Sequence, residues 1–119
     1  SAAKTLYDAC GAQNWISEKS FARDGYGGKA DLHCDGFLID IKTTTKPLQD
    51  IKTWPEHEIQ LAAYRHGLGY PDAKSGILYV HAETAESKLL WIPETDLQRG
   101  LKCFMALKAY FYAKTGLGD

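Results

Sequence analysis

The chain has 119 residues, of which 45% are hydrophobic and 24% are charged, and its formal net charge is −1. This length and composition are typical of one ordinary globular domain, which we expect to cover residues 1–119. A nearly neutral chain lacks the overall positive field of proteins that coat nucleic acids, but it is compatible with an enzyme whose acidic centre offsets local lysines.

The cysteine content argues against several kinds of site. Cys10, Cys34 and Cys103 are odd in number, lie far apart and form no C-x-x-C motif. We therefore expect no disulfide framework, no cysteine-ligated zinc or iron–sulfur site, and a reducing, cytoplasmic location. No apolar run reaches membrane-spanning length and no signal peptide is recognisable, so we expect no membrane association.

The first part of the chain is predicted to form a helix and three antiparallel strands. Apolar residues at helical spacing predict the helix over residues 2–12. A strand is expected over residues 14–24, and the glycine-rich residues 25–28 are expected to turn the chain into the second strand. The Asp35-Gly36 pair is a strong two-residue hairpin signal, which predicts a third strand that ends near residue 43.

The middle of the chain predicts a loop, a helix and two strands. Residues 44–52 are polar and contain a proline, which favours a loop. Thr53 as N-cap and Glu56 three residues later fit a capping box, so a helix is expected from here to about residues 67–69. Two short apolar runs, at residues 76–81 and 87–92, are predicted to be strands.

The last predicted element is a long helix that starts at Pro93-Glu94 and ends at Gly116. One stripe along it is apolar, and we expect this stripe to belong to the core together with Trp91. The members of the stripe are Leu97, Leu101, Phe104, Leu107 and Phe111.

Two carboxylates and a lysine lie on the strands that flank the predicted hairpin. Because side chains alternate along a strand, Asp40 and Lys42 share one face, and a turn at Asp35-Gly36 allows Asp31 to join it. His33 shares that face by parity, but we expect it at the surface. Buried charges need partners, and a divalent cation would supply one.

A magnesium or manganese site is the predicted partner of these carboxylates. Mg²⁺ prefers oxygen ligands and keeps several waters, so Asp31 and Asp40 suffice as protein carboxylates. A backbone carbonyl near Ile41 and the carboxylate of Glu18 are further candidate ligands. Such a metal serves phosphodiester hydrolysis, because it neutralises the scissile phosphate and activates water. Lys42 is then placed to orient the water or to stabilise developing negative charge.

Nucleic-acid contacts are predicted for residues near this centre. Gln60 and Tyr64 lie four residues apart on one helix face, which suits phosphate or base contacts, or support of the metal carboxylates. Three cationic residues are expected to contact the backbone of a bound strand, namely Lys46, Lys52 and Arg65.

The chain contains three motifs in order: G-x-x-x-D ending at Asp31, D-I-K ending at Lys42, and Q-x-x-x-Y ending at Tyr64. This order of motifs resembles that of the PD-(D/E)XK nuclease superfamily. The resemblance is closest to its RecB-like, phage-type exonuclease branch and spans roughly Glu18 to His81. It implies an α/β, restriction-endonuclease-like core, in which a mixed β-sheet (an antiparallel three-strand meander plus further strands) is flanked by helices.

The resemblance also implies a function: an exonuclease that hydrolyses phosphodiester bonds at DNA ends or in single strands, with Mg²⁺ or Mn²⁺ bound by Asp31 and Asp40. Lys42 would be catalytic, with Gln60 and Tyr64 as the helix motif beside the site. The family often has a longer N-terminal helical region with an upstream histidine, which this sequence does not include. The cysteine cluster of the iron–sulfur members is also missing.

Other functions remain open at this point. One alternative is a structure-specific endonuclease on the same fold. Another is a nucleic-acid-binding module of a larger recombination or repair assembly, with a helicase, a recombination protein or further copies of the chain as partners. No phosphate-binding G-x-x-x-x-G-K-[ST] motif occurs, so no nucleotide cofactor is expected. Each residue alone has a structural alternative: Asp31 as a turn residue, and Glu18 or the lysines as solvated side chains.

Overall fold

The structure is a computed structural model that describes residues 1–23 and 26–116, with side chains for residues 1–17 and 31–116. In chain order its elements are α1 (Ala2–Cys10), β1 (Ile16–Arg23), β2 (Tyr26–Cys34), β3 (Phe37–Thr44), the 3-10 turn η1 (Leu48–Asp50), α2 (Pro55–Leu68), β4 (Lys74–His81), β5 (Ser87–Trp91) and α3 (Glu94–Thr115).

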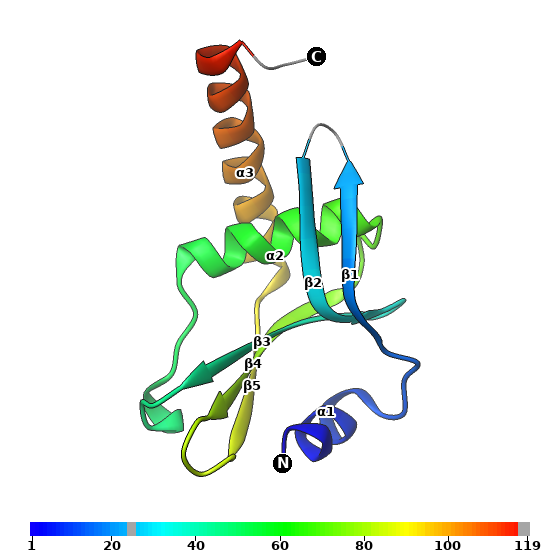
Figure 1. Cartoon of the computed structure of the whole chain (residues 1–119), viewed down its shortest axis with the longest axis vertical. Coiled ribbons are helices and arrows are strands. Elements are labelled where there is room, and N and C mark those ends of the chain that lie inside the picture. The colour runs from blue at the N-terminus through cyan, green and yellow to red at the C-terminus, as the bar shows by residue number, and fades with distance from the viewer. Residues whose placement is uncertain (24–25, 117–119) are drawn as a thin grey trace.

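Within the described residues, five strands form one mixed sheet in the order β1-β2-β3-β4-β5. Neighbouring strands are antiparallel except β3 and β4, which run parallel and are joined through α2. A parallel pair needs such a crossover, because a short turn cannot return the chain to the same end of the sheet. The predicted α/β fold with a mixed sheet and flanking helices is confirmed (Figure 1).

The Asp35-Gly36 hairpin forms as predicted and sets the register of β2 against β3. Cys34 pairs with Phe37, and the pairing continues to Leu32 opposite Ile39. Beyond that pair β2 leaves β3 and continues beside β1. Figure 1 shows β1 and β2 standing upright next to α2, while β3, β4 and β5 run below it.

The two faces of the sheet carry separate apolar clusters. On the face covered by α2 and α3, Leu38 and Ile77 pack with Leu61 of α2 and Leu97 of α3. On the opposite face, Ile39 and Leu78 pack with Leu6 of α1. Alternate residues of β3 therefore point to different layers, as the period of a strand requires. The site described below lies on the α2 face, at the end of β3 beyond its pairing with β2.

Helix α2 begins one residue later than its sequence suggests. Trp54, not Thr53, is the N-cap, and its backbone N–H donates to Nδ1 of His57 at 3.2 Å. The prediction of a capping box between Thr53 and Glu56 is therefore wrong by one residue. Pro55 explains the shift, since a proline with its preset φ and missing N–H is favoured at the first helical position. The helix ends at Gly69 in the left-handed conformation, with φ 79°.

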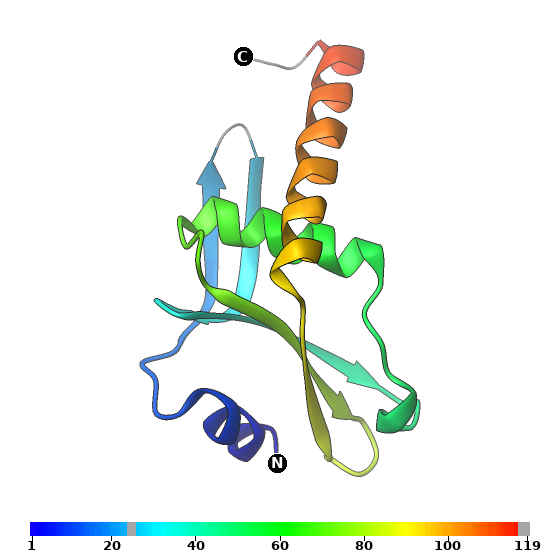
Figure 2. The same ribbon diagram turned by 180° about the vertical axis from the view of Figure 1, so that it is seen from behind.

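The predicted core stripe of α3 is only half correct. Leu97 is buried, but Leu107 and Phe111 are 58% and 51% exposed, and Tyr110 between them is 64% exposed. Figures 1 and 2 show why: α3 crosses α2 near its own start and then extends beyond it, away from β3, β4 and β5. Helical periodicity reports an apolar face, but it does not report how far the layer beneath that face extends.

Two further expectations are corrected. Tyr26, Gly27 and Gly28 belong to β2 and pair with β1, so the predicted turn over residues 25–28 is misplaced, and its start lies outside the described residues. His33 is fully buried, against the ring of Tyr70 at 5.4 Å between centroids, and is not a surface residue. Among the described helices, none is both long and apolar enough to cross a membrane.

Candidate active site

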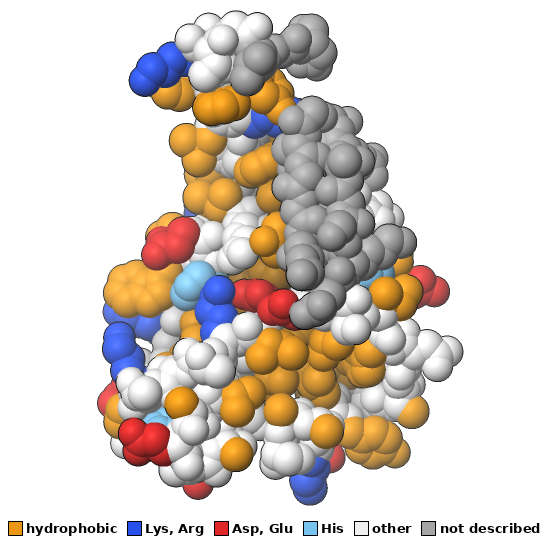
Figure 3. Space-filling view, viewed as in Figure 1, with side chains coloured by type: hydrophobic (Ala, Val, Ile, Leu, Met, Phe, Trp, Pro, Cys, Tyr) orange, Lys and Arg blue, Asp and Glu red, His pale blue; other side chains and the backbone are white. Residues whose placement is uncertain are grey.

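The structure brings Asp31, Asp40 and Lys42 together where β2 departs from β3. Asp31 Oδ2 accepts a hydrogen bond from the backbone N–H of Ile41 at 2.7 Å. Lys42 Nζ lies 3.0 Å from Asp40 Oδ2. Because β2 no longer pairs with β3 at this point, the Ile41 N–H is available to a side chain. Figure 3 shows carboxylate side chains in the middle of this face, with lysine and histidine side chains beside them.

Asp40 is held in an environment that disfavours its charged form. The residue is only 8% exposed. Burial, and after it the neighbouring Asp31 carboxyl, raise the pKa of Asp40 to about 6, and the Lys42 ammonium opposes this rise without cancelling it. Among the described residues, no group donates a well-aligned hydrogen bond to Asp40 Oδ2, although Lys42 Nζ is close. An additional positive charge at this position would therefore be favourable.

Lys42 remains protonated in this setting. Burial acts to lower the pKa of Lys42, but the adjacent Asp40 carboxylate, together with Tyr79 and Asp31, outweighs it, and the net pKa is raised. The side chain is 30% exposed, so its ammonium can reach a bound molecule while staying paired with Asp40. A protonated lysine can donate hydrogen bonds and stabilise negative charge, but it cannot take up a proton.

The donor set at this centre fits a hard divalent cation. Two carboxylates meet, one of them buried with a poorly satisfied oxygen, which is the chemistry that Mg²⁺ or Mn²⁺ accepts when waters complete the shell. Among the described side chains, no group of three histidine, cysteine or acidic residues could form a larger metal site. The side chain of Glu18 lies outside the described residues, and the Ile41 carbonyl stays a predicted ligand.

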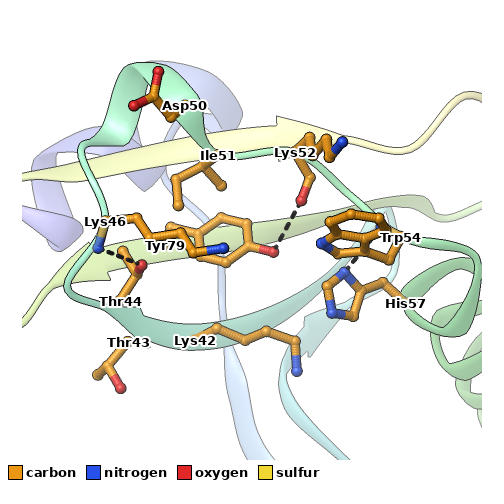
Figure 4. A pocket seen from close by; sticks show the side chains of 10 residues that line it. All are labelled: Lys42, Thr43, Thr44, Lys46, Asp50, Ile51, Lys52, Trp54, His57 and Tyr79. Carbon is orange, nitrogen blue, oxygen red and sulfur yellow. Dashed lines mark hydrogen bonds between the residues drawn. The ribbon is translucent and has the colours of Figure 1, made fainter.

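A cleft of about 240 Å³ lies between the end of β3, which carries Lys42, and the segment that leads into α2. Lys46 and Lys52 both line it, and their contact with a bound strand stays a prediction. Sequence reasoning missed the other lining residues, among them Tyr79, Trp54 and His57. Tyr79 occupies the β4 position paired with Lys42, and its hydroxyl donates to the Lys52 carbonyl at 3.5 Å (Figure 4).

Gln60 and Tyr64 are neighbours on α2, as their spacing predicts. Gln60 Nε2 donates to the Tyr64 hydroxyl at 2.9 Å. Both side chains line a mostly apolar hollow of about 370 Å³ between α2 and α3, together with Phe104 and Leu107. The structure therefore places the pair toward α3, and its role in nucleic-acid contact stays a prediction.

Arg65 does not have the position expected of a phosphate-binding residue. It is 4% exposed, and its guanidinium makes a bidentate ion pair with Glu94 of α3, at 2.7 and 2.6 Å. The same group donates to the Ala73 carbonyl at 3.2 Å. Arg65 thus ties α2 to the start of β4 and to α3, and the expectation that it contacts a bound strand is corrected.

Among the comparisons with known proteins, the likeness to one solved structure supports the fold. No protein-family model and no curated protein matches this sequence. A crystal structure from Eubacterium rectale, described as a "putative exonuclease", is similar with a TM-score of 0.66 and 16% identity, over 99% of this chain and 49% of that one. A crystal structure of SSO0001 has a TM-score of 0.44 and 18% identity, over 88% of this chain and 55% of that one.

The likeness to the Eubacterium rectale structure defines a class of fold. Both share a mixed α/β arrangement in which helices flank one sheet, and at 16% identity the likeness shows this fold alone. The chain spans about half the length of that protein. What the site does must therefore be argued from its own residues.

Proposed function

We propose that the protein is a divalent-metal-dependent nuclease that hydrolyses phosphodiester bonds in DNA, most readily as an exonuclease at ends or in single strands. The observation that carries this proposal is the meeting of Asp31, Asp40 and a protonated Lys42 at one open strand end. A fold shared with a structure described as a putative exonuclease supports it.

In this proposal Asp31 and Asp40 hold Mg²⁺ or Mn²⁺, with Glu18 and the Ile41 carbonyl as further ligands. When bound, the metal supplies neutralisation of the phosphate and activation of a water. The Asp31 carboxylate is oriented by the Ile41 N–H, so its position does not depend on the ligand. The Asp40 carboxylate is held by its burial and by Lys42.

The role of Lys42 follows from its charge. Its raised pKa keeps it an ammonium, so it donates a hydrogen bond to the attacking water or to a phosphate oxygen and does not act as a general base. Its ion pair with Asp40 holds the ammonium beside the carboxylate that would bind the metal. Lys46 and Lys52 extend positive charge along the cleft, where they would contact the strand backbone.

The test is cleavage of end-labelled single-stranded DNA, duplex DNA and a closed circle, each with Mg²⁺, Mn²⁺ or EDTA. We expect cleavage of linear DNA that needs metal and is lost in Lys42→Ala and Asp40→Asn. Cleavage of the closed circle would point to an endonuclease on the same fold. If folded protein cuts nothing with either metal, the enzyme proposal is wrong, and a binding module within a larger assembly becomes the better account.

A further inference from the structure

The cleft beside the candidate active site contains an aromatic residue that the nuclease chemistry does not use. Trp54 lines the cleft and is 45% exposed, although tryptophan is usually largely buried. It lies at the end of the cleft close to His57, while Lys42 runs along the cleft floor toward the same end (Figure 4). The cleft therefore links the acidic centre to an accessible indole ring.

We propose that Trp54 forms a base-stacking subsite that binds one unpaired nucleotide of the substrate strand. This inference rests on the proposed function for the placement of the scissile phosphate near Lys42. Aromatic rings in a cationic groove are how proteins hold single strands without reading their sequence, because every base has a face that can stack.

The charges around Trp54 suit a nucleotide. Lys52 Nζ lies 4.3 Å from the centroid of the Trp54 ring, so a cation already sits against the ring. Lys46 is exposed and lies at the end of the cleft away from Trp54, and Lys42 runs along the cleft floor (Figure 4). A strand that follows the cleft would thus meet lysines along its phosphates and an aromatic ring at one of its bases.

The backbone around the subsite is held in place before any ligand arrives. The Trp54 N–H donates to His57 Nδ1 at 3.2 Å, and the His57 N–H donates to the Trp54 carbonyl at 2.9 Å. Burial and the nearby Lys42 charge lower the pKa of His57, which keeps the ring neutral so that Nδ1 can accept. An ordered backbone at Trp54 leaves less conformational freedom to be lost on binding.

The geometry favours unpaired over paired nucleotides. Inside a duplex each base is stacked on both sides, and its edge is occupied by its partner. A base can lie on Trp54 only after it has left that stack, which costs free energy unless the strand is already single. The subsite therefore gives the nuclease a preference for single strands or frayed ends, without contacts to base edges.

The test is the affinity of the whole chain for a short fluorescein-labelled oligothymidylate and for a blunt duplex of equal strand length. Fluorescence anisotropy is measured in EDTA and again with Ca²⁺. We expect Trp54→Ala to weaken single-strand binding about 5- to 150-fold, the range reported for removal of one stacking aromatic residue, and to leave duplex binding unchanged. Trp54→Phe should retain most of the affinity, because a ring remains.

A matched control separates the subsite from a general loss of surface aromatics. Tyr7 on α1 is 64% exposed, and α1 packs on the opposite face of the sheet, so Tyr7→Ala should bind like the parent. Lys46→Gln should reduce the salt dependence of single-strand binding by about 0.7 in the slope of log K against log salt, if Lys46 contacts one phosphate. Circular dichroism checks that each variant is folded.

Several results would overturn the inference. Equal single-strand affinity in Trp54→Ala and the parent, an equal loss for single strand and duplex, or no single-strand binding by the parent would each do so. These outcomes are independent of cleavage. A parent that cuts DNA but is indifferent to Trp54→Ala refutes the subsite alone. A selective loss of binding in Trp54→Ala from a parent that cuts nothing supports the subsite and refutes the nuclease.

Discussion

Replacement of Asp40 by asparagine should stabilise the metal-free protein at neutral pH. The environment of Asp40 raises its pKa from an ordinary 3.8 to about 6, so the folded state carries a charge that the unfolded state bears more easily. A shift of roughly two units at about 1.4 kcal/mol per unit gives about 3 kcal/mol as an upper limit. Solvent reaches the site through Lys42, and screening reduces this to about 1–2 kcal/mol.

The sign of the pH dependence follows from the same shift. Between pH 3.8 and about 6 the folded protein binds more protons at Asp40 than the unfolded chain does, so this group lowers stability as the pH rises. Asparagine has no such titration. Near pH 3.8 the ionisation of Asp40 should therefore make little difference between the stabilities of variant and parent. Above about pH 6 the variant should show its full gain in the free energy of unfolding.

The assay is thermal unfolding in EDTA across this pH range, followed by circular dichroism. At neutral pH we expect Asp40→Asn to melt about 4–8 °C above the parent, given the entropy of unfolding of a chain of this size. Asp50→Asn removes a carboxylate from an exposed position in the adjacent cleft and serves as the control. Saturating Mg²⁺ should reverse the order, since ligand at 100 times its Kd adds about 2.7 kcal/mol to the parent only.

An Asp40→Asn variant that is less stable than the parent in EDTA at neutral pH would contradict this assignment of Asp40. The same stability difference between variant and parent at pH 4 and at pH 7 would contradict it as well. Either result would mean that the carboxylate is a net stabilising group, and the argument that it awaits a cation would lose its basis.

Two further predictions concern the contacts that hold the helices. Hydrogen bonding to Arg65 lowers the pKa of Glu94 to about 2. Glu94→Gln should therefore destabilise the protein by about 1 kcal/mol at neutral pH. In chemical unfolding, the stability difference between variant and parent should shrink as the pH falls from 4.5 toward 2. A Cβ at Gly100 would lie 2.7 Å from the Glu58 carbonyl oxygen, so Gly100→Ala should lower the free energy of unfolding in urea by about 1–3 kcal/mol. As the control, a Cβ at Gly36 meets no atom within 4 Å, so Gly36→Ala should leave the free energy of unfolding nearly unchanged. A stable Gly100→Ala, or a Glu94→Gln difference that grows with acid, would contradict these assignments.

The hairpin and the carboxylate cluster were predictable because local rules determine them. Asp35-Gly36 selects a two-residue turn, the turn sets the register, and strand alternation then places Asp31 beside Asp40 and Lys42. None of these steps needs knowledge of distant contacts. The same holds for the end of α2, where a glycine adopts the left-handed conformation after a helical pattern.

Other features could not be read from the sequence because they depend on packing between distant elements. Arg65 looks like any helical arginine until Glu94, 29 residues later, is found against it. Leu107 and Phe111 continue an apolar stripe, yet both lie on the part of α3 that extends past its packing partners, and both are exposed. The sequence shows Trp54 as an aromatic residue near lysines and just before Pro55, but this pattern alone does not predict that the ring is exposed in a cleft.

We propose above all that Asp31 and Asp40 together hold a divalent cation. The most direct test is a titration of the protein with Mn²⁺, in which free Mn²⁺ is counted by electron paramagnetic resonance without any DNA. We expect binding by the parent that is lost or strongly weakened in both Asp31→Asn and Asp40→Asn, and retained in Asp50→Asn. Undiminished Mn²⁺ binding in the two carboxylate variants, or no binding by the folded parent, would contradict the account.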